Sequence, residues 1–238
     1  MNSPLATQTL FHIGPVPITE QVALTWVLMV VLSACCWAVT RRMSLTPSRL
    51  QAFLELVVET VDGQIRETMQ AEPAPYRAFI GTLFVFILFA NWTSLVPGAE
   101  PPTAHVETDA ALALLVFLAV IHFSVRANGV SGYLRSFASP SLLMVPLNFV
   151  ESITRIFSLL VRLFGNVMSG VFVVGIVLSL AGFLVPIPLM ALDLLTGGVQ
   201  AYIFAVLATV FIAGTVSEGR PAASDNAASS NETERGPQ

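Results

Sequence analysis

Residues 151–170 read ESITRIFSLLVRLFGNVMSG, and this stretch decides how the rest of the chain is interpreted. It lies within the longest apolar part of the sequence, yet it contains Glu151, Arg155 and Arg162. An arginine keeps its positive charge at any ordinary pH, and placing one at the centre of a bilayer costs about 2.5 to 3.5 kcal/mol on insertion scales. Because a chain that accepts this cost usually uses the charge, we predict that Arg162 acts on a carboxylate supplied by another subunit.

The composition around this stretch is typical of a polytopic membrane protein. Of the 238 residues, 55% are hydrophobic and only 11% are charged, which excludes an ordinary soluble domain. The net charge is −4 and every basic residue is an arginine, so no basic excess favours a nucleic-acid partner. The adjacent Cys35 and Cys36 offer neither a disulfide framework nor metal-ligand spacing. No metal site and no cofactor are predicted, because no motif for either occurs.

Five apolar segments have the length of membrane spans, which predicts an all-α fold. Their ranges are 22–40, 78–96, 110–126, 146–180 and 188–216. The segment 47–71 has apolar residues at helical spacing with acids and arginine opposite them, and it is too polar to cross a bilayer. We therefore predict an amphipathic interfacial helix there, within a single membrane domain of residues 1–218. Residues 219–238 are rich in Ala, Ser, Asn and Glu and are predicted to form a disordered cytoplasmic tail.

The last two spans are longer than a bilayer is thick. As continuous helices they would measure about 52 Å and about 43 Å, against a hydrocarbon core of about 30 Å. Helices of this length must tilt strongly in order to stay within the membrane. A steep tilt would present a stripe of side chains along the membrane plane.

The arginines fall on one side of the membrane when five spans are drawn. The N-terminal arm, the 97–109 loop and the 181–188 turn contain none. By the positive-inside rule the N-terminus faces outward and the C-terminus is cytoplasmic. The arginines on the cytoplasmic side are Arg41, Arg42, Arg49, Arg66, Arg77, Arg126, Arg135, Arg220 and Arg235.

Polar residues at helical spacing mark the fourth span as a candidate site. Arg155 and Arg162 are seven residues apart and therefore share one helix face. Glu151 lies four residues before Arg155, so we interpret these two as a structural pair. Arg162 has no such local partner, and two interpretations stay open: it meets a carboxylate of another subunit, or it pairs inside the bundle with Asp193. The face of Arg162 continues through Ser158, Asn166 and Ser169.

Other candidates for an ion path come from the last span and from the loop before the third span. Asp193 is the only acid deep in the last span, and it either relays an ion or caps the helix. Gln200 either bonds across to Arg162 or serves ordinary helix packing. The loop residues His105, Glu107 and Asp109 would form an acidic outer mouth, unless they are simply solvated.

At RLFGN (162–166) the chain resembles subunit a of the F-type ATP synthase, and the resemblance covers most of the sequence. It includes QAYIFAVLATVFIA (200–213), PTAHVETDAALALLVF (102–117) and GVSGYLRSF (129–137). The resemblance implies a membrane stator with two aqueous half-channels, in which Arg162 faces the carboxylates of a rotating c-subunit ring. It also implies the peripheral-stalk subunit b as a partner, indirect contact with the F1 sector, and a bacterial inner membrane. Such a subunit works in ATP synthesis or hydrolysis without being an enzyme on its own.

The chain departs from the family pattern at several polar positions. Val171 stands where the family commonly has glutamate, and Asn148 replaces another glutamate. Asp193 stands where histidine or glutamate is usual, and His105 replaces the aspartate of the PTAD segment. These changes are typical of a divergent bacterial branch, such as the N-type ATPase. The proton is the expected ion, and the alternatives are a sodium-translocating version, a self-contained secondary transporter or a structural anchor.

Overall fold

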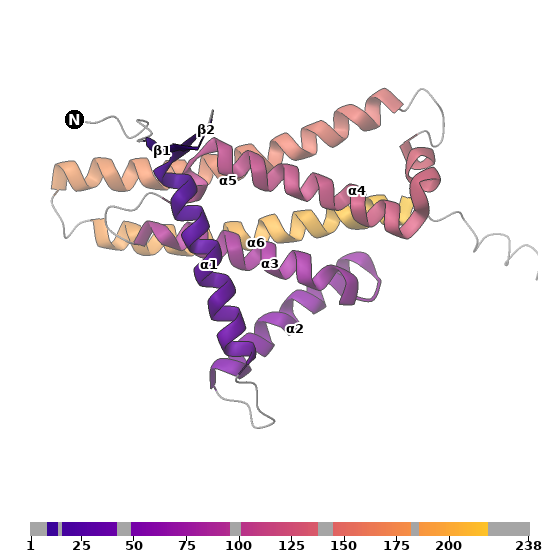
Figure 1. Cartoon of the computed structure of the whole chain (residues 1–238), viewed down its shortest axis with the longest axis horizontal. Coiled ribbons are helices and arrows are strands. Elements are labelled where there is room, and N and C mark those ends of the chain that lie inside the picture. The colour runs from indigo at the N-terminus through magenta and orange to yellow at the C-terminus, as the bar shows by residue number, and fades with distance from the viewer. Residues whose placement is uncertain are drawn as a thin grey trace, which may run out of the picture.

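The computed structural model describes residues 9–13, 16–41, 49–95, 101–137, 145–181 and 186–218 (Figure 1). Within these ranges every regular element is helical except one antiparallel hairpin of two short strands before the first helix. The all-α prediction is therefore confirmed, and the predicted tail 219–238 lies outside the described residues. The elements are β1 Thr9–Ile13, β2 Val16–Thr19, α1 Glu20–Thr40, α2 Arg49–Met69, α3 Ala74–Trp92, η1 Thr93–Leu95, η2 Pro102–Ala104, α4 Val106–Phe137, α5 Val145–Ala181 and α6 Pro186–Glu218.

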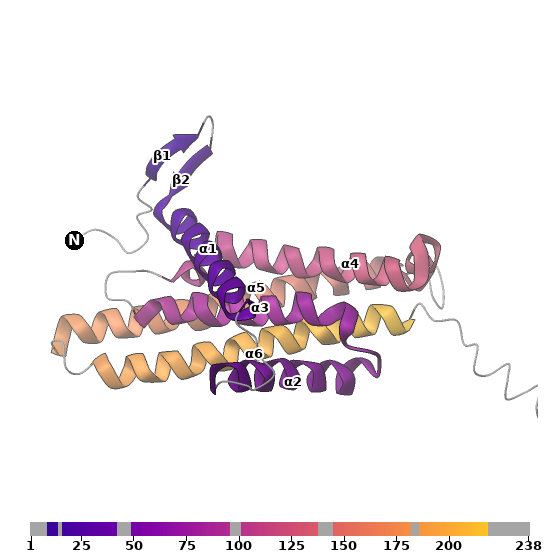
Figure 2. The ribbon, with the colours of Figure 1, turned by 60° about the horizontal axis from the view of Figure 1, so that its bottom comes forward.

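Five of the helices are long and apolar enough to cross a bilayer, as predicted. Their spanning segments are Val22–Thr40, Ala74–Leu95, Val106–Val130, Val145–Leu180 and Ile187–Ser217. Figures 1 and 2 show α3, α4, α5 and α6 running together along the long axis of the molecule, while α1 crosses this direction obliquely. With 37 and 33 residues, α5 and α6 are about 55 Å and about 50 Å long. Both far exceed the thickness of a hydrocarbon core.

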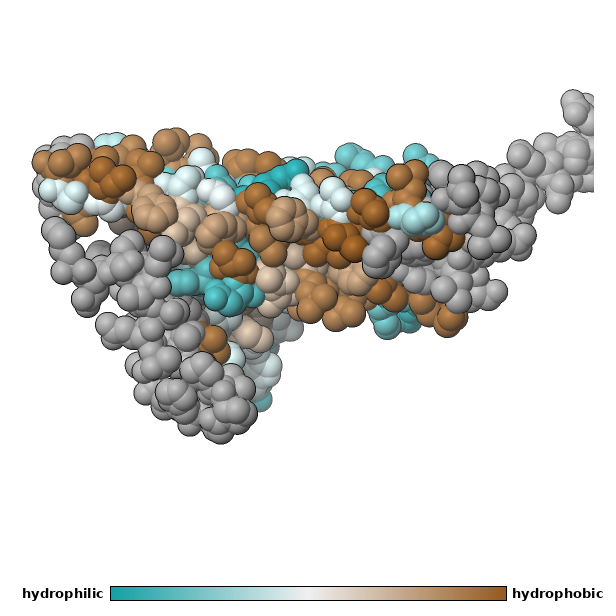
Figure 3. Space-filling view, turned by 90° about the horizontal axis from the view of Figure 1, so that it is seen from above, coloured by the Kyte–Doolittle hydropathy of each residue, from teal (hydrophilic) through white to brown (hydrophobic). Residues whose placement is uncertain are grey.

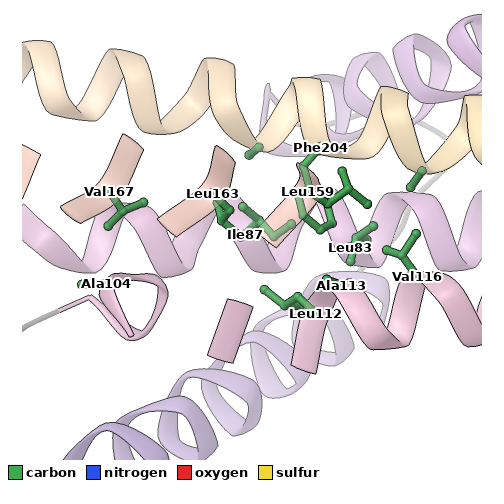
Figure 4. Close-up of a cluster of buried hydrophobic side chains, with 12 residues drawn as sticks. Leu83, Ile87, Ala104, Leu112, Ala113, Val116, Leu159, Leu163, Val167 and Phe204 are labelled. Carbon is green, nitrogen blue, oxygen red and sulfur yellow. The ribbon is translucent and has the colours of Figure 1, made fainter. Parts of the chain in front are cut away.

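The core of the bundle is apolar and draws on four helices. Leu83 and Ile87 of α3 meet α4 and Phe204 of α6, and α5 contributes three residues spaced by four (Figure 4). These three, Leu159, Leu163 and Val167, are buried because residues four apart lie above one another on one helix face. The polar stripe of α5 is displaced from this face, so packing turns it toward the outside of the bundle. Figure 3 shows a mostly hydrophobic surface over the helices, broken by hydrophilic patches.

The amphipathic helix predicted at 47–71 is α2, and it is packed against α3 and α6. Ile65 is fully buried in a cluster with Tyr76 and Ile212. Arg77 at the start of α3 forms an ion pair with Asp62, which ties the two helices together. Apolar residues near the beginning of α2, such as Leu56, remain exposed. That α2 lies in the membrane interface remains a prediction.

Helix α4 is longer than the predicted span 110–126. It begins at Val106 and continues to Phe137, with a kink at Gly129, whose φ is 73°. The extension past the span is supported by hydrogen bonds to the end of α6. Ser124 Oγ donates to the carbonyl of Thr215, and Asn128 Nδ2 donates to that of Val216, both at 3.2 Å. A positive φ suits glycine, so the change of direction falls there.

Candidate functional site

The end of α3 is fastened to α6 by a buried asparagine. Asn91 Nδ2 donates to the carbonyl of Gly197 at 2.9 Å, and Asn91 Oδ1 accepts from Thr103 Oγ1 of η2 at 2.7 Å. The close approach needs a glycine, since a Cβ at position 197 would lie 3.0 Å from the Asn91 Cβ. Trp92 Nε1 adds a longer bond to the carbonyl of Leu194, at 3.3 Å. These contacts hold one turn of α6 against α3 and η2.

Asp193 lies on this turn, and its carboxylate reaches α5. Ser94 Oγ donates to Asp193 Oδ2 at 3.2 Å. On the α5 side, a Cβ at Gly170 would lie 3.0 Å from Asp193 Cγ and would overlap Oδ1. The interpretation of Asp193 as a helix cap is wrong, because α6 begins at Pro186, seven residues earlier. The half-buried carboxylate instead fills the space that a missing side chain leaves between α5 and α6.

The prediction that His105, Glu107 and Asp109 share one loop is also wrong. Glu107 and Asp109 belong to the first turn of α4, and residues two apart on a helix point to different sides. Glu107 is exposed, whereas Asp109 is 0% exposed and neither of its carboxylate oxygens has a hydrogen-bond partner among the described residues. His105 precedes the helix and is half-buried, and its carbonyl accepts from the Asp109 amide at 3.3 Å. Asp109 therefore lies inside the protein, away from solvent.

Arg162 is exposed on the outward face of α5. Its side chain makes no ion pair or hydrogen bond with any residue that the structure describes. Exposed Ser158 and Ser169 flank it on the same face, and the apolar Val161 beside it is 47% exposed. The guanidinium is thus presented on a surface of small and apolar residues.

The alternative in which Arg162 pairs with Asp193 inside the bundle is not found. Asp193 lies against Gly170, which is eight residues, or about 12 Å of helix, from Arg162. Gln200 is buried and its Nε2 has no partner among the described residues. No hydrogen bond joins Arg162 to the Gln200 side chain, so the interpretation in which Gln200 bonds across to Arg162 is not found either. Asn166 is half-buried, and its carbonyl accepts from Ser169 Oγ at 2.8 Å.

A groove follows α5 from Ser158, one turn before Arg162, toward the N-terminal end of the helix. Its volume is about 500 Å³. Glu151 and Arg155 form an ion pair inside it, and the Arg155 guanidinium lies 5.4 Å from the centre of the Phe211 ring of α6. Arg162 therefore stands between two polar regions, the Asp193 region on one side and this groove on the other. The groove is lined by Leu147, Val150, Glu151, Thr154, Arg155, Ser158 and Phe211.

Sequence reasoning did not single out Asn91, Ser94, Thr103 or Gly170. Asn91 and Ser94 give no signal because a polar residue near the end of an apolar segment is common at a membrane interface. Thr103 gives none because it lies in the predicted 97–109 loop, where polar residues are ordinary. Gly170 contributes to the site because it has no side chain, and the sequence alone does not show that Asp193 lies opposite it. Only the packing of the helices brings Ser94 and Gly170 to Asp193, and Asn91 to Gly197 and Thr103.

Comparison with known proteins identifies the family to which the chain is similar. A family profile described as "ATP synthase A chain" matches residues 22–213. ATP synthase subunit a 2 of a Bradyrhizobium species is 53% identical over 221 residues, covering 92% of this chain and 99% of that protein. ATP synthase subunit a of Albidiferax ferrireducens is 43% identical over 210 residues, covering 87% and 91%. Subunit a 2 of Acaryochloris marina is 46% identical over 209 residues, covering 87% and 89%.

These matches extend over nearly all of the described helices, including the region of Arg162. They replace the interpretation as a self-contained transporter, because the relatives are named as subunits of a larger machine. The chain belongs to the subunit a family of the bacterial F-type ATP synthase, as a multi-pass membrane component of that complex.

Proposed function

We propose that Arg162 is the stator charge that meets the carboxylates of a rotating c-subunit ring. The single observation that carries this proposal is the placement of Arg162: exposed, on an outward helix face, and without a partner in the described part of the chain. A charge in that position is costly in a membrane unless an anion approaches it from outside. A carboxylate on an adjacent ring supplies such an anion, and it is renewed as the ring turns.

The physical role follows from the permanent charge of the guanidinium. At 4 Å in an environment of effective dielectric constant about 20, it attracts an ionised carboxylate by about 4 kcal/mol. This attraction favours the ionised carboxylate and so promotes release of the bound ion. A lysine would serve less well, since a buried ammonium gives up its proton more readily than a guanidinium. Arg162 would also repel cations and thereby block direct leakage between the two sides.

Two half-channels are proposed on either side of Arg162. On the outer side the path uses Asp193, with Ser169, Asn166 and Gln200 between it and the ring. The contacts of Asp193 with Ser94 and Gly170 support this, since they hold a carboxylate at the α5–α6 contact. The inner half-channel leaves Arg162 toward the N-terminal end of α5.

The acids at the start of α4 have unequal parts in this proposal. Asp109, buried and without a hydrogen-bond partner among the described residues, is assigned to the path inside the protein. Glu107 is exposed and His105 half-buried, and both are assigned to the outer entrance. An ion would meet Glu107 and His105 first and Asp109 after them.

We further propose that the transported ion is the proton. Carboxylates such as Asp193 and Asp109 can take up and release a proton directly. Asp193 accepts a hydrogen bond from the Ser94 hydroxyl, and a hydroxyl can donate to an ionised carboxylate or accept from a protonated one. Sodium is the second candidate. ATP-driven uptake into vesicles containing the whole complex distinguishes the two. Acidification without sodium that a protonophore abolishes supports the proton, and sodium-dependent uptake that survives the protonophore overturns it.

The orientation and the remaining partners are part of the same proposal. The N-terminus faces outward and the C-terminus lies in the cytoplasm of a bacterium, with subunit b beside this chain and the F1 sector reached indirectly. The clustering of α2, the start of α3 and the end of α6 supports this, because it brings the region of Arg66 and Arg77 to the same end of the bundle as the end of α6. A cysteine introduced near residue 218 should react with an impermeant reagent only from the cytoplasmic side.

The test of Arg162 is the variant Arg162→Ala in the assembled complex. We expect ATP-driven ion pumping to be lost while the complex still assembles and inserts. Arg126→Ala is the matched control, because Arg126 is also exposed but lies on α4, near the end of its spanning segment Val106–Val130. Full coupled pumping by Arg162→Ala would refute the proposal. Loss of pumping by both variants would show that removing any exposed arginine disturbs assembly.

A further inference from the structure

The groove beside α5 contains an ion pair that the mechanism so far does not use. We propose that Glu151 and Arg155 line the inner half of the ion path and keep that stretch electrically balanced. This inference rests on the proposed function, since it needs a cation to pass between the cytoplasm and Arg162. Under this inference the Glu151–Arg155 pair is not a purely structural contact, because it helps to set the rate of ion movement.

The first observation is the groove itself. It has a volume of about 500 Å³, enough for several water molecules, and four of its seven lining residues carry polar side chains. Three of these four, Glu151, Arg155 and Ser158, continue at spacings of four, three and four residues to Arg162. A spacing of three or four keeps residues on one helix face. The groove and the stator arginine therefore lie along one stripe of α5.

The second observation is the way in which Arg155 is held. It forms an ion pair with Glu151, and its guanidinium lies over the ring of Phe211 from α6. A second, smaller cavity of about 40 Å³ also borders Arg155 and reaches Ser152 of α5 and Thr215 of α6. Arg155 is only 38% exposed, whereas Glu151 is 53% exposed, so the carboxylate is the more accessible of the two charges. Both contacts hold the arginine at the wall of the groove.

The electrostatic consequence follows from the charges. Arg155 and Arg162 are seven residues, or about 10 Å, apart along α5, so an unbalanced Arg155 would add a second positive barrier for a departing cation. An unbalanced Glu151 would instead attract the cation and delay its release. When both charges are present, their electric fields largely cancel at a distance. The cation then passes a polar groove that neither binds it strongly nor repels it strongly. Either charge alone is harmful, and the loss of both is tolerated.

The main test is a double-variant cycle in the whole complex, with Arg162 intact. ATP-driven pumping is measured for Glu151→Gln, for Arg155→Gln and for the two combined. We expect each single variant to lower the pumping rate about fivefold and the combination to return it to within about twofold of the starting protein. A combination that pumps no faster than the slower single variant would overturn the proposal, and so would single variants with unchanged rates.

A matched control uses the other ion pair between described residues. Asp62 and Arg77 join α2 to α3 away from the groove, and Arg77 is 45% exposed. Asp62→Asn, Arg77→Gln and their combination should all pump at the starting rate, because neither residue lines the groove. A restoration pattern in this pair equal to that of Glu151 and Arg155 would mean that ion-pair loss acts on folding alone, which would also overturn the inference.

A second measurement asks whether water enters the groove. Ser158→Cys, in a protein whose Cys35 and Cys36 are replaced by serine, is treated with a membrane-impermeant thiol reagent from each side. Reaction from the cytoplasmic side alone supports the inference, and failure to react from that side overturns it. Failure of this inference is distinguishable from failure of the proposed function, because the proposed function is tested separately by Arg162→Ala. If that variant cannot pump but the pair variants behave like the control, only the inference falls.

Discussion

Gly170→Ala is the substitution for which the structure makes the sharpest statement. The new Cβ would lie 3.0 Å from the carboxylate carbon of Asp193, where an ordinary contact is 3.4–4 Å, and it would overlap Oδ1. Since Oδ1 would lie 2.1 Å from the new Cβ, this oxygen must retreat by about 1.3 Å to reach the shortest ordinary contact of 3.4 Å. The bond from Ser94 Oγ, already long at 3.2 Å, is expected to break.

The energetic and functional consequences differ in size. Overpacking of this kind costs about 1 to 3 kcal/mol, and a lost hydrogen bond adds about 1 kcal/mol, so the protein should still fold and assemble. Transport is more sensitive, because a misplacement of about 1 Å in a reacting group can lower a rate a hundredfold. We expect ATP-driven pumping to fall at least about tenfold, provided that Asp193 lies on the ion path.

Gly175→Ala is the control for this prediction. Gly175 lies on the same helix, and no atom lies near enough to meet a Cβ there. It should pump normally, and equal rates for Gly170→Ala and Gly175→Ala would refute the reasoning. A second check is thermal stability in the Asp193→Ala background. There the crowded carboxylate is gone, so adding Gly170→Ala should cost almost nothing more.

Two further predictions concern buried polar groups. Asn91→Ala removes two hydrogen bonds that join α3 to η2 and α6, so it should destabilise the protein by about 1 to 3 kcal/mol, measured as thermal inactivation of the purified complex. An unchanged inactivation temperature would mean that water replaces these bonds. Asp109→Asn removes the ionisable group at a buried site without changing its shape, so it should slow pumping, whereas Asp62→Asn on α2 should not. Equal rates for the two variants would remove Asp109 from the path.

Much of the candidate site could be predicted from the sequence because Arg162 itself is conspicuous. A charge in an apolar segment is unusual, and the spacing of Glu151, Arg155 and Arg162 already put them on one face of a helix. The sequence-based prediction for Glu107 and Asp109 is wrong because α4 begins four residues before the predicted span 110–126. Both acids therefore lie on the helix and not in a loop. Glu107 and Asp109 then face different environments. Acids favour the first turn of a helix, but they are also common in polar loops, so their presence does not fix where the helix begins.

The sequence by itself determined the class of the protein, its five spans and the residue to consider first. Hydropathy is summed over about twenty consecutive residues, so it identifies membrane spans without any knowledge of which helices pack together. Only the tertiary structure decided that Arg162 faces outward, that Asp193 lies against Gly170, and that Asp109 is buried. These outcomes depend on contacts such as Asn91 with Gly197, which are 106 residues apart in the chain. A side chain's partner is set by which helix faces pack together, and that choice is made by the whole bundle at once.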